Sequence, residues 1–114
     1  MKAAEVDLAH LWDMLRAARV AHQMGAGISA DQLLDDLRTR LALERALEIV
    51  GEAARRVSPR RRAQCPEIPW RGIIGFRHVL AHEYGEIDYR RLHAVASVSV
   101  PKLIADLERR LPAR

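Results

Sequence analysis

The stretch that decides the fold is Trp70 to Tyr89, WRGIIGFRHVLAHEYGEIDY. It holds four of the five aromatic residues of the chain and two of its five histidines. Pro69 comes directly before it, and proline is favourable in the first turn of a helix. We therefore expect a helix that begins near Pro69 and ends at Gly85 or just after His82.

Three residues near the end of this helix have complementary chemistry: Arg77, His82 and Tyr84. A guanidinium group binds phosphate through a planar fork of donors. An imidazole moves a proton near neutral pH, and a phenol offers a hydroxyl group as nucleophile or acceptor. Together they supply the groups that RNA chemistry requires.

The spacing of Arg77 and His82 does not make them neighbours on a helix. Five residues of an ideal helix leave them roughly 140° apart in direction, with a rise of about 7.5 Å. Either the helix loosens before Gly85, or a second copy of the chain presents its own pair across a two-fold axis. Metal-free RNA cleavage favours the second arrangement, because it needs a base for the 2′-hydroxyl and an acid for the leaving 5′-oxygen. Arg77 would hold the scissile phosphate.

The residues alone leave other roles open for this stretch. Arg77 tied to a carboxylate, with His82 closing a helix, is a structural arrangement that is commoner than catalysis. His78 and His82 are four apart, on one helix face as in a metal-binding pair. No acid completes an H-E-x-x-H pattern and no cysteine cluster is available, so we predict neither a metal nor a cofactor.

The rest of the chain predicts a helical support for this stretch. Of the 114 residues, 49% are hydrophobic but only 4% are aromatic, so the core must consist of Leu, Ala, Val and Ile. No segment shows the alternation of a strand. We predict an all-α bundle of four main helices with short extra helices, folded as one domain over residues 1–114.

Composition also bounds the cellular context. A single cysteine, Cys65, excludes an internal disulfide and a cysteine-based metal site. The N-terminus carries early acids and no long apolar run, and no stretch approaches a membrane span. We expect a soluble, cytoplasmic protein that does not engage a membrane.

Apolar periodicity predicts the first two helices. The first runs over 4–24 and is closed by glycines. Ser29 and Gln32 match a capping box, which opens a long second helix over 30–57. The apolar positions of this second helix are Leu34, Leu37, Leu41, Ala46, Ile49, Val50, Ala53 and Val57.

The remaining helices are predicted from caps and prolines. Ser58 and Pro59 suit the start of a short helix. A fourth main helix begins near Asp88, and Pro101 kinks or breaks it before a helical tail over 103–111.

Two features of the second helix bear on the site. Gly51 lies in its interior, where glycine costs roughly 1 kcal/mol relative to alanine, so we expect the close approach of another backbone. Glu44, Glu48 and Glu52 form one stripe, which is usually solvated or paired with arginine. Glu48 or Glu52 orienting Arg77 from across the core is the alternative.

The chain is moderately basic, with a formal charge of +4 and a pI near 10.0. A run of charges is most often a solvated loop. Because the densest basic run comes shortly before the motif, a patch that steers RNA is a rival interpretation. This run consists of Arg55, Arg56, Arg60, Arg61 and Arg62.

The segment IPWRGIIGFRHVLAHEYGEID, residues 68–88, resembles the signature of HepT-like HEPN ribonuclease toxins, whose core is Arg-x4-His-x-Tyr. The preceding RALEIVGEAARRVS resembles the second-helix signature of the same group. The resemblance implies an all-α, up-and-down HEPN bundle and a homodimer whose active cleft forms where two motif helices meet. It also implies a metal-independent endoribonuclease of a type VII-like toxin–antitoxin pair, whose partner is a minimal nucleotidyltransferase antitoxin.

Carried over residue by residue, the resemblance makes Arg77 the phosphate-binding residue, His82 the proton-transfer residue and Tyr84 the acceptor of AMP. AMP on Tyr84 would place a negative phosphate beside Arg77 and so silence the toxin. His78 stands where the family commonly has Asn, which leaves RNA preference and pH dependence open. The alternative is a non-catalytic HEPN module that binds a nucleotide, a nucleic acid or a nucleotidyltransferase.

Overall fold

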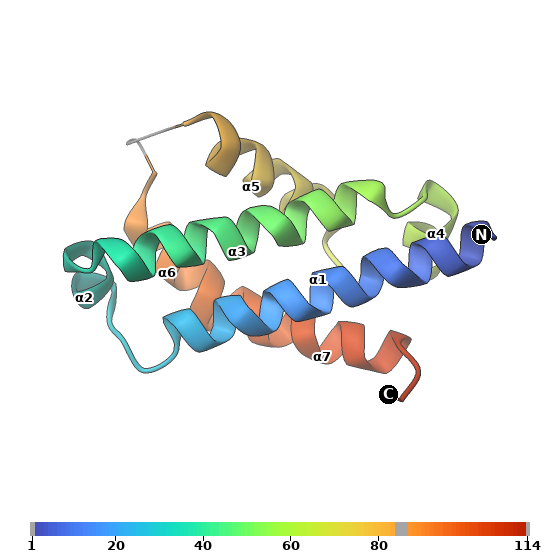
Figure 1. Cartoon of the computed structure of the whole chain (residues 1–114), viewed down its shortest axis with the longest axis horizontal. Helices are drawn as coiled ribbons and strands as arrows, with labels where there is room; N and C mark the ends of the chain where they lie inside the picture. Colours follow the sequence, from blue (N-terminus) through green and yellow to red (C-terminus); the bar gives the residue numbers. More distant parts are fainter. Residues whose placement is uncertain (1, 84–86, 114) are drawn as a thin grey trace.

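The computed structural model describes residues 2–83 and 87–113, and every regular element in those ranges is helical (Figure 1). Four long helical segments run alternately up and down, and two short helices, α2 (Ala30–Asp35) and α4 (Pro59–Gln64), lie between them. The long segments are α1 (Ala3–Gly25), α3 (Leu37–Arg56), α5 (Trp70–His82) and the continuous run of α6 (Tyr89–Ala94), η1 (Val95–Ser99) and α7 (Val100–Arg110). This confirms the predicted all-α bundle. None of the helices in the described ranges has the length and apolar character needed to cross a membrane.

The core lies where α1 packs against α3 and against the η1–α7 segment. Its largest fully buried side chains are mostly aliphatic, as the composition predicts: Leu11, Met14, Leu15, Leu33, Leu43, Ile68, Leu92 and Leu107. In contrast, α5 packs mainly on α3. A groove of about 480 Å³ remains between α5 and the η1–α7 segment, with Phe76 and Val95 in its lining.

The predicted single helix over 30–57 is wrong, because the chain breaks at Asp36. Asp36 has non-helical backbone angles, φ −115° and ψ 88°, and caps α3, accepting hydrogen bonds from the backbone N–H of Thr39 at 3.1 Å and from its hydroxyl at 2.7 Å. The capping box at the start of α2 is confirmed. The Ser29 backbone N–H donates to Gln32 Oε1 at 2.8 Å, and the Gln32 N–H donates to Ser29 Oγ at 3.1 Å.

The break changes which side chains reach the core. Leu34, Leu37 and Leu41 are apolar positions of the predicted long helix, yet they are 49%, 57% and 56% exposed. Leu33 and Leu43 are fully buried instead. One of the three exposed leucines lies on α2, and the other two lie on the first turns of α3.

Pro101 does not break the last helix, because the helix widens into a π turn before it. Val95–Ser99 forms a π turn, in which the Val100 N–H donates to the Val95 carbonyl five residues earlier. Pro101 then occupies the first turn of α7, where its missing N–H is tolerated. The helical direction therefore continues from α6 into α7 (Figure 1).

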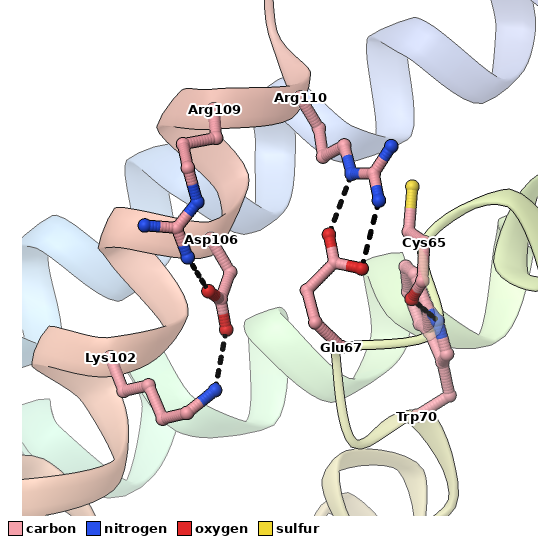
Figure 2. Close-up of polar contacts among 7 residues, drawn as sticks. All are labelled: Cys65, Glu67, Trp70, Lys102, Asp106, Arg109 and Arg110. Atoms are coloured by element: carbon pink, nitrogen blue, oxygen red, sulfur yellow. Dashed lines mark hydrogen bonds and ion pairs between the residues drawn. The ribbon is translucent and has the colours of Figure 1, made fainter.

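The segment before α5 is tied to α7 by a set of polar contacts (Figure 2). Arg110 donates from Nε to Glu67 Oε1 at 2.6 Å and from Nη2 to Glu67 Oε2 at 3.0 Å. The Trp70 indole N–H donates to the Cys65 carbonyl at 3.1 Å. These contacts fix the start of α5 and so set the direction of the motif helix.

A second carboxylate close to this segment is almost completely buried. Asp106 is 1% exposed and accepts hydrogen bonds from Lys102, at 2.8 Å, and from Arg109 (Figure 2). Both cations lie on the same helix as Asp106, one turn before and one turn after it. We call these three residues the Asp106 cluster.

Candidate active site

The motif helix α5 presents its two candidate catalytic residues to different sides. Phe76 and Leu80 are buried, and Arg77 is half-buried against α3. His82 is exposed and is the last helical residue, since the Glu83 N–H still donates to the Val79 carbonyl at 3.0 Å. The helix thus ends just after His82, one of the two predicted ends, and does not loosen before it. One chain alone does not bring Arg77 and His82 side by side.

Close packing at Gly51 determines where Arg77 lies. A Cβ atom at Gly51 would come within 2.1 Å of Arg77 Cβ and 3.2 Å of the Ile73 carbonyl oxygen. No side chain fits in that space, so only glycine lets α5 cross α3 at this distance. The expected close approach at Gly51 is confirmed, and Arg77 lies at the crossing point.

Glu52, the residue after Gly51, contacts three arginines. Its carboxylate lies 2.9 Å from Arg55 Nη2, 3.2 Å from Arg56 Nη2 and 2.9 Å from Arg77 Nη2. The hydrogen bond from Arg55 is the main cause that lowers the pKa of Glu52; desolvation opposes it, and the charges of Arg55, Arg77 and Arg56 add to it. One carboxylate facing three guanidinium groups leaves an excess of positive charge. We call these four residues the Glu52 cluster.

Hydrogen bonding within the Glu52 cluster is incomplete. Arg77 Nη2 and Glu52 Oε2 are close enough for an ion pair, but the N–H is not aligned with the oxygen. Among the residues that the structure describes, Arg77 Nε and Glu52 Oε2 are buried atoms without a hydrogen-bond partner. Buried polar groups are normally paired, so these two atoms are exceptions, as are Arg40 Nε and Arg61 Nε.

The glutamates of the predicted stripe have separate surroundings. Glu52 contacts Arg77, which is the arrangement proposed as an alternative to a solvated stripe. Glu48 pairs with Arg45 at 3.3 Å. Burial raises the pKa of Glu44, with the charge of Arg40 opposing the shift.

The basic run divides into two groups with different contacts. Arg55 and Arg56 belong to the Glu52 cluster. Arg62 turns back on α3, where its Nε donates to the Val57 carbonyl at 3.0 Å and its Nη2 donates to the Arg55 carbonyl at 2.9 Å. Those bonds satisfy carbonyl groups at the end of α3, a structural role that a charge run does not reveal.

Arg60 and Arg61 lie with Arg62 on α4, which Ser58 caps as predicted. Arg61 donates to Gln64 at 3.4 Å, and Arg60 is exposed to solvent. Ser58 is itself held by Asp7 of α1, which accepts from the Ser58 backbone N–H at 2.8 Å and from its hydroxyl at 2.6 Å.

The two histidines of the motif helix contact each other. The ring centroids of His78 and His82 lie 4.4 Å apart, with an angle of 56° between the ring planes. Both side chains are exposed. Tyr84, the predicted AMP acceptor, lies outside the described residues. Within the described ranges, no group of three or more His, Cys, Asp or Glu side chains is arranged to hold a metal ion.

A groove between α1 and α3 opens beside the Glu52 cluster. Its volume is about 500 Å³, and both Glu52 and Arg56 line it. Arg16 of α1 and Arg45 of α3 also line it, each in an ion pair, Arg16 with Asp13 of the same groove and Arg45 with Glu48. Sequence reasoning missed these two arginines, because they lie on different helices and only the packing of α1 against α3 brings them together.

Comparison with known proteins agrees with the motif and the fold. The family model described as "Ribonuclease HepT-like" matches residues 5–110. A protein of Methanocaldococcus jannaschii named "Putative RNase MJ1380" is 34% identical over 100 residues, covering 88% of this chain and 92% of that protein. A protein of Thermococcus cleftensis named "Probable ribonuclease HepT" is 32% identical over 109 residues, covering 96% and 97%.

No solved structure matches the chain. The family match nevertheless spans all of the main helices, and the curated relatives align over nearly their whole lengths. The chain belongs to the ribonuclease HepT-like family.

Proposed function

We propose that the chain is a metal-independent endoribonuclease that acts as a homodimer, with its active cleft where two copies of α5 meet. The observation that carries this proposal is that α5 presents Arg77 and His82 to different sides. Arg77 lies at the α3–α5 crossing with an unpaired guanidinium nitrogen, while His82 faces solvent on the same helix. A second copy is the simplest way to complete a site from these parts.

In this mechanism one imidazole accepts the 2′-hydroxyl proton, and the 2′-oxygen attacks the adjacent phosphorus. The bond from phosphorus to the 5′-oxygen breaks, and the imidazole of the second subunit donates a proton to that oxygen. The products are a 2′,3′-cyclic phosphate and a free 5′-hydroxyl. Arg77 stabilises the negative charge that develops on the phosphate, and Glu52 acts as a positioning residue that holds the guanidinium group at the crossing.

The exposed leucines support pairing of two chains. Leu34 lies on α2, and Leu37 and Leu41 lie on the first turns of α3; all three are exposed. Large apolar side chains on a surface are typical of contacts with another protein when they form a patch. Burying them against a second copy would stabilise a dimer.

Arginines around the Glu52 cluster support an RNA path toward Arg77. Arg56 lines the α1–α3 groove together with Arg16 and Arg45. Each phosphate contact releases counterions, so RNA binding along this path should weaken as salt rises. Arg60 offers a further exposed cation, whereas the guanidinium of Arg62 is engaged by backbone carbonyls.

The regulatory part of the proposal concerns a nucleotidyltransferase antitoxin. Transfer of AMP to Tyr84 would add a phosphate two residues after His82. Negative charge there would compete with the RNA phosphate for Arg77. A mass spectrum of the chain co-expressed with a candidate nucleotidyltransferase tests this, since an unchanged mass in the presence of ATP would count against modification.

The nuclease is tested by cleavage of a mixed RNA substrate in the presence of a chelator. We expect the unmodified chain to cleave, and both Arg77→Ala and His82→Ala to lose activity. His22→Ala, at an exposed histidine on α1, is the matched control and should retain activity. RNA binding without cleavage by the wild type would favour the non-catalytic module instead.

Mixing wild-type chains with His82→Ala chains tests the shared site. A heterodimer of the two keeps a single imidazole at the cleft and so lacks either the base or the acid, and mixing should lower the activity below that of the wild-type chains present. Activity in proportion to the wild-type chains, in a mixture shown to contain heterodimers, would argue that each chain works alone.

A further inference from the structure

His78 and His82 contact each other, and the mechanism proposed above for RNA cleavage assigns no role to His78. We propose that this pair binds a divalent transition metal ion such as Zn²⁺, Ni²⁺ or Cu²⁺, and that the bound ion blocks His82. The binding claim depends only on the two side chains. The claim that binding inhibits cleavage rests on the proposed function.

The ring geometry is close to that of a chelate. Metal–nitrogen bonds of about 2.0–2.1 Å to two imidazoles set the ring centres roughly 4.5–5 Å apart at ordinary coordination angles. The observed separation is 4.4 Å, with the planes inclined at 56°. A small rotation of either side chain would open the remaining space, and both side chains are exposed. The helix therefore holds the two ligands near the distance that an ion requires.

The ligand type selects the class of ion. Neutral imidazole suits zinc, copper and nickel, whereas magnesium and calcium prefer oxygen ligands. Solvent exposure of both rings lets water occupy the remaining coordination positions. Two ligands four residues apart lie on one helix face, so binding needs no change in the backbone.

Metal binding and proton transfer compete for the same nitrogen lone pairs. An imidazole that donates its lone pair to a metal cannot accept the 2′-hydroxyl proton. A cation bound at His82 would therefore inhibit cleavage, and a chelator would reverse the inhibition. The metal acts here as an inhibitor and takes no part in the chemistry.

Binding is tested directly on the untagged full chain by calorimetric titration with Ni²⁺ or Zn²⁺. We expect one ion per chain, with affinity reduced about 10-fold or more by either His78→Gln or His82→Gln, because each removes one of two ligands. His22→Gln, at an exposed histidine on α1, should bind as the wild type does. Equal affinity in the wild type and His78→Gln, or equal loss in His22→Gln, would overturn the site.

The effect on cleavage is tested separately, with each variant compared with its own metal-free rate. Zn²⁺ should inhibit the wild type but not His78→Asn, which keeps His82 and removes its partner ligand. Equal inhibition of both would overturn the link to cleavage. If the wild type binds the ion as predicted but cleaves no RNA under any condition, the nuclease proposal fails while the metal site stands.

Discussion

Two carboxylates in this chain are surrounded by cations, and their surroundings differ. Asp106 is 1% exposed, and both of its oxygens accept hydrogen bonds from residues of its own helix. Glu52 is partly exposed and lies between two helices, with three arginines around it and one oxygen left without a hydrogen bond. The Asp106 cluster is satisfied internally, whereas the Glu52 cluster is not.

This difference indicates that the Asp106 cluster is a structural contact and that the Glu52 cluster is a candidate binding site. Complete pairing stabilises one conformation and leaves nothing for a ligand to bind. Incomplete pairing with excess positive charge lowers local stability but leaves donors for an incoming phosphate. Changes at the Glu52 cluster should therefore alter activity, and changes at the Asp106 cluster should alter stability.

The largest expected effect is that of Arg77→Lys. Lysine keeps the charge but loses the planar fork of donors, so we expect the cleavage rate to fall by about 10²-fold. The same substitution at Arg109, a partner of Asp106, should leave the rate nearly unchanged. Equal rates for Arg77→Lys and the wild type would remove Arg77 from the mechanism; single-turnover cleavage measures both.

Gly51→Ala tests the crossing that positions the Glu52 cluster. The new Cβ would lie 2.1 Å from Arg77 Cβ, so α3 and α5 must separate. We expect a loss of about 1–3 kcal/mol in the free energy of unfolding, together with a fall in the cleavage rate that is smaller than that of Arg77→Lys. Denaturant titration measures the first effect.

Gly72→Ala is the control for that substitution, on the same motif helix. A Cβ at Gly72 would meet nothing within 4 Å, so alanine should increase stability by up to about 1 kcal/mol. If both glycine variants changed stability in the same direction, the contact at Gly51 would not be the cause.

Asp106→Ala should lower stability and leave the cleavage rate unchanged, unlike a change at the active site. Removing a buried, hydrogen-bonded carboxylate is expected to lower the free energy of unfolding by about 1–3 kcal/mol. The cleavage rate of the folded protein should stay at the wild-type level. Glu108→Ala, at an exposed pair with Arg19, should cost less than about 0.5 kcal/mol. A large loss of rate in Asp106→Ala would contradict the division between the two clusters.

The smallest expected effect is a pH dependence at the second contact shown in Figure 2. Hydrogen bonds from Arg110 lower the pKa of Glu67 from 4.5 to about 2. A lowered carboxyl pKa adds stability that is fully present above pH 4.5 and is lost as the pH falls toward 2. Arg110→Gln should therefore be less stable than the wild type at neutral pH, and the difference in stability should shrink as the pH falls through 2.

Thermal melts across that range measure the difference. Arg60→Gln, at an exposed residue, serves as the control and should follow the wild type at every pH. A difference between wild type and Arg110→Gln that stayed constant down to pH 2 would exclude Glu67 as its source.

Local patterns predicted most of the fold because the signals act over one or two turns. Periodicity placed the first helix over 4–24, and the structure has it at Ala3–Gly25. The Ser29 capping box and the start near Pro69 are also local, and both are confirmed. The break at Asp36 was missed because the apolar spacing continues across it, although an aspartate three residues before Thr39 is an N-cap signal.

The candidate site was less predictable because it depends on contacts between helices. Gly51 indicated a close approach, but not that Arg77 would fill the space. The run of basic residues gave no sign that Arg62 caps α3 while Arg55 and Arg56 contact Glu52. Those assignments depend on the direction of each side chain, which sequence spacing does not determine.

The π turn at Val95–Ser99 bears on how relatives of different length are compared with this chain. Its hydrogen-bonded loop holds one residue more than an α-helical loop does. A homologue lacking one residue here can form an ordinary α-helix and still keep the residues equivalent to Leu103 and Leu107 in the core. A one-position gap placed within 95–99 therefore keeps equivalent residues aligned on both sides, whereas a gap placed elsewhere would misalign the last helix.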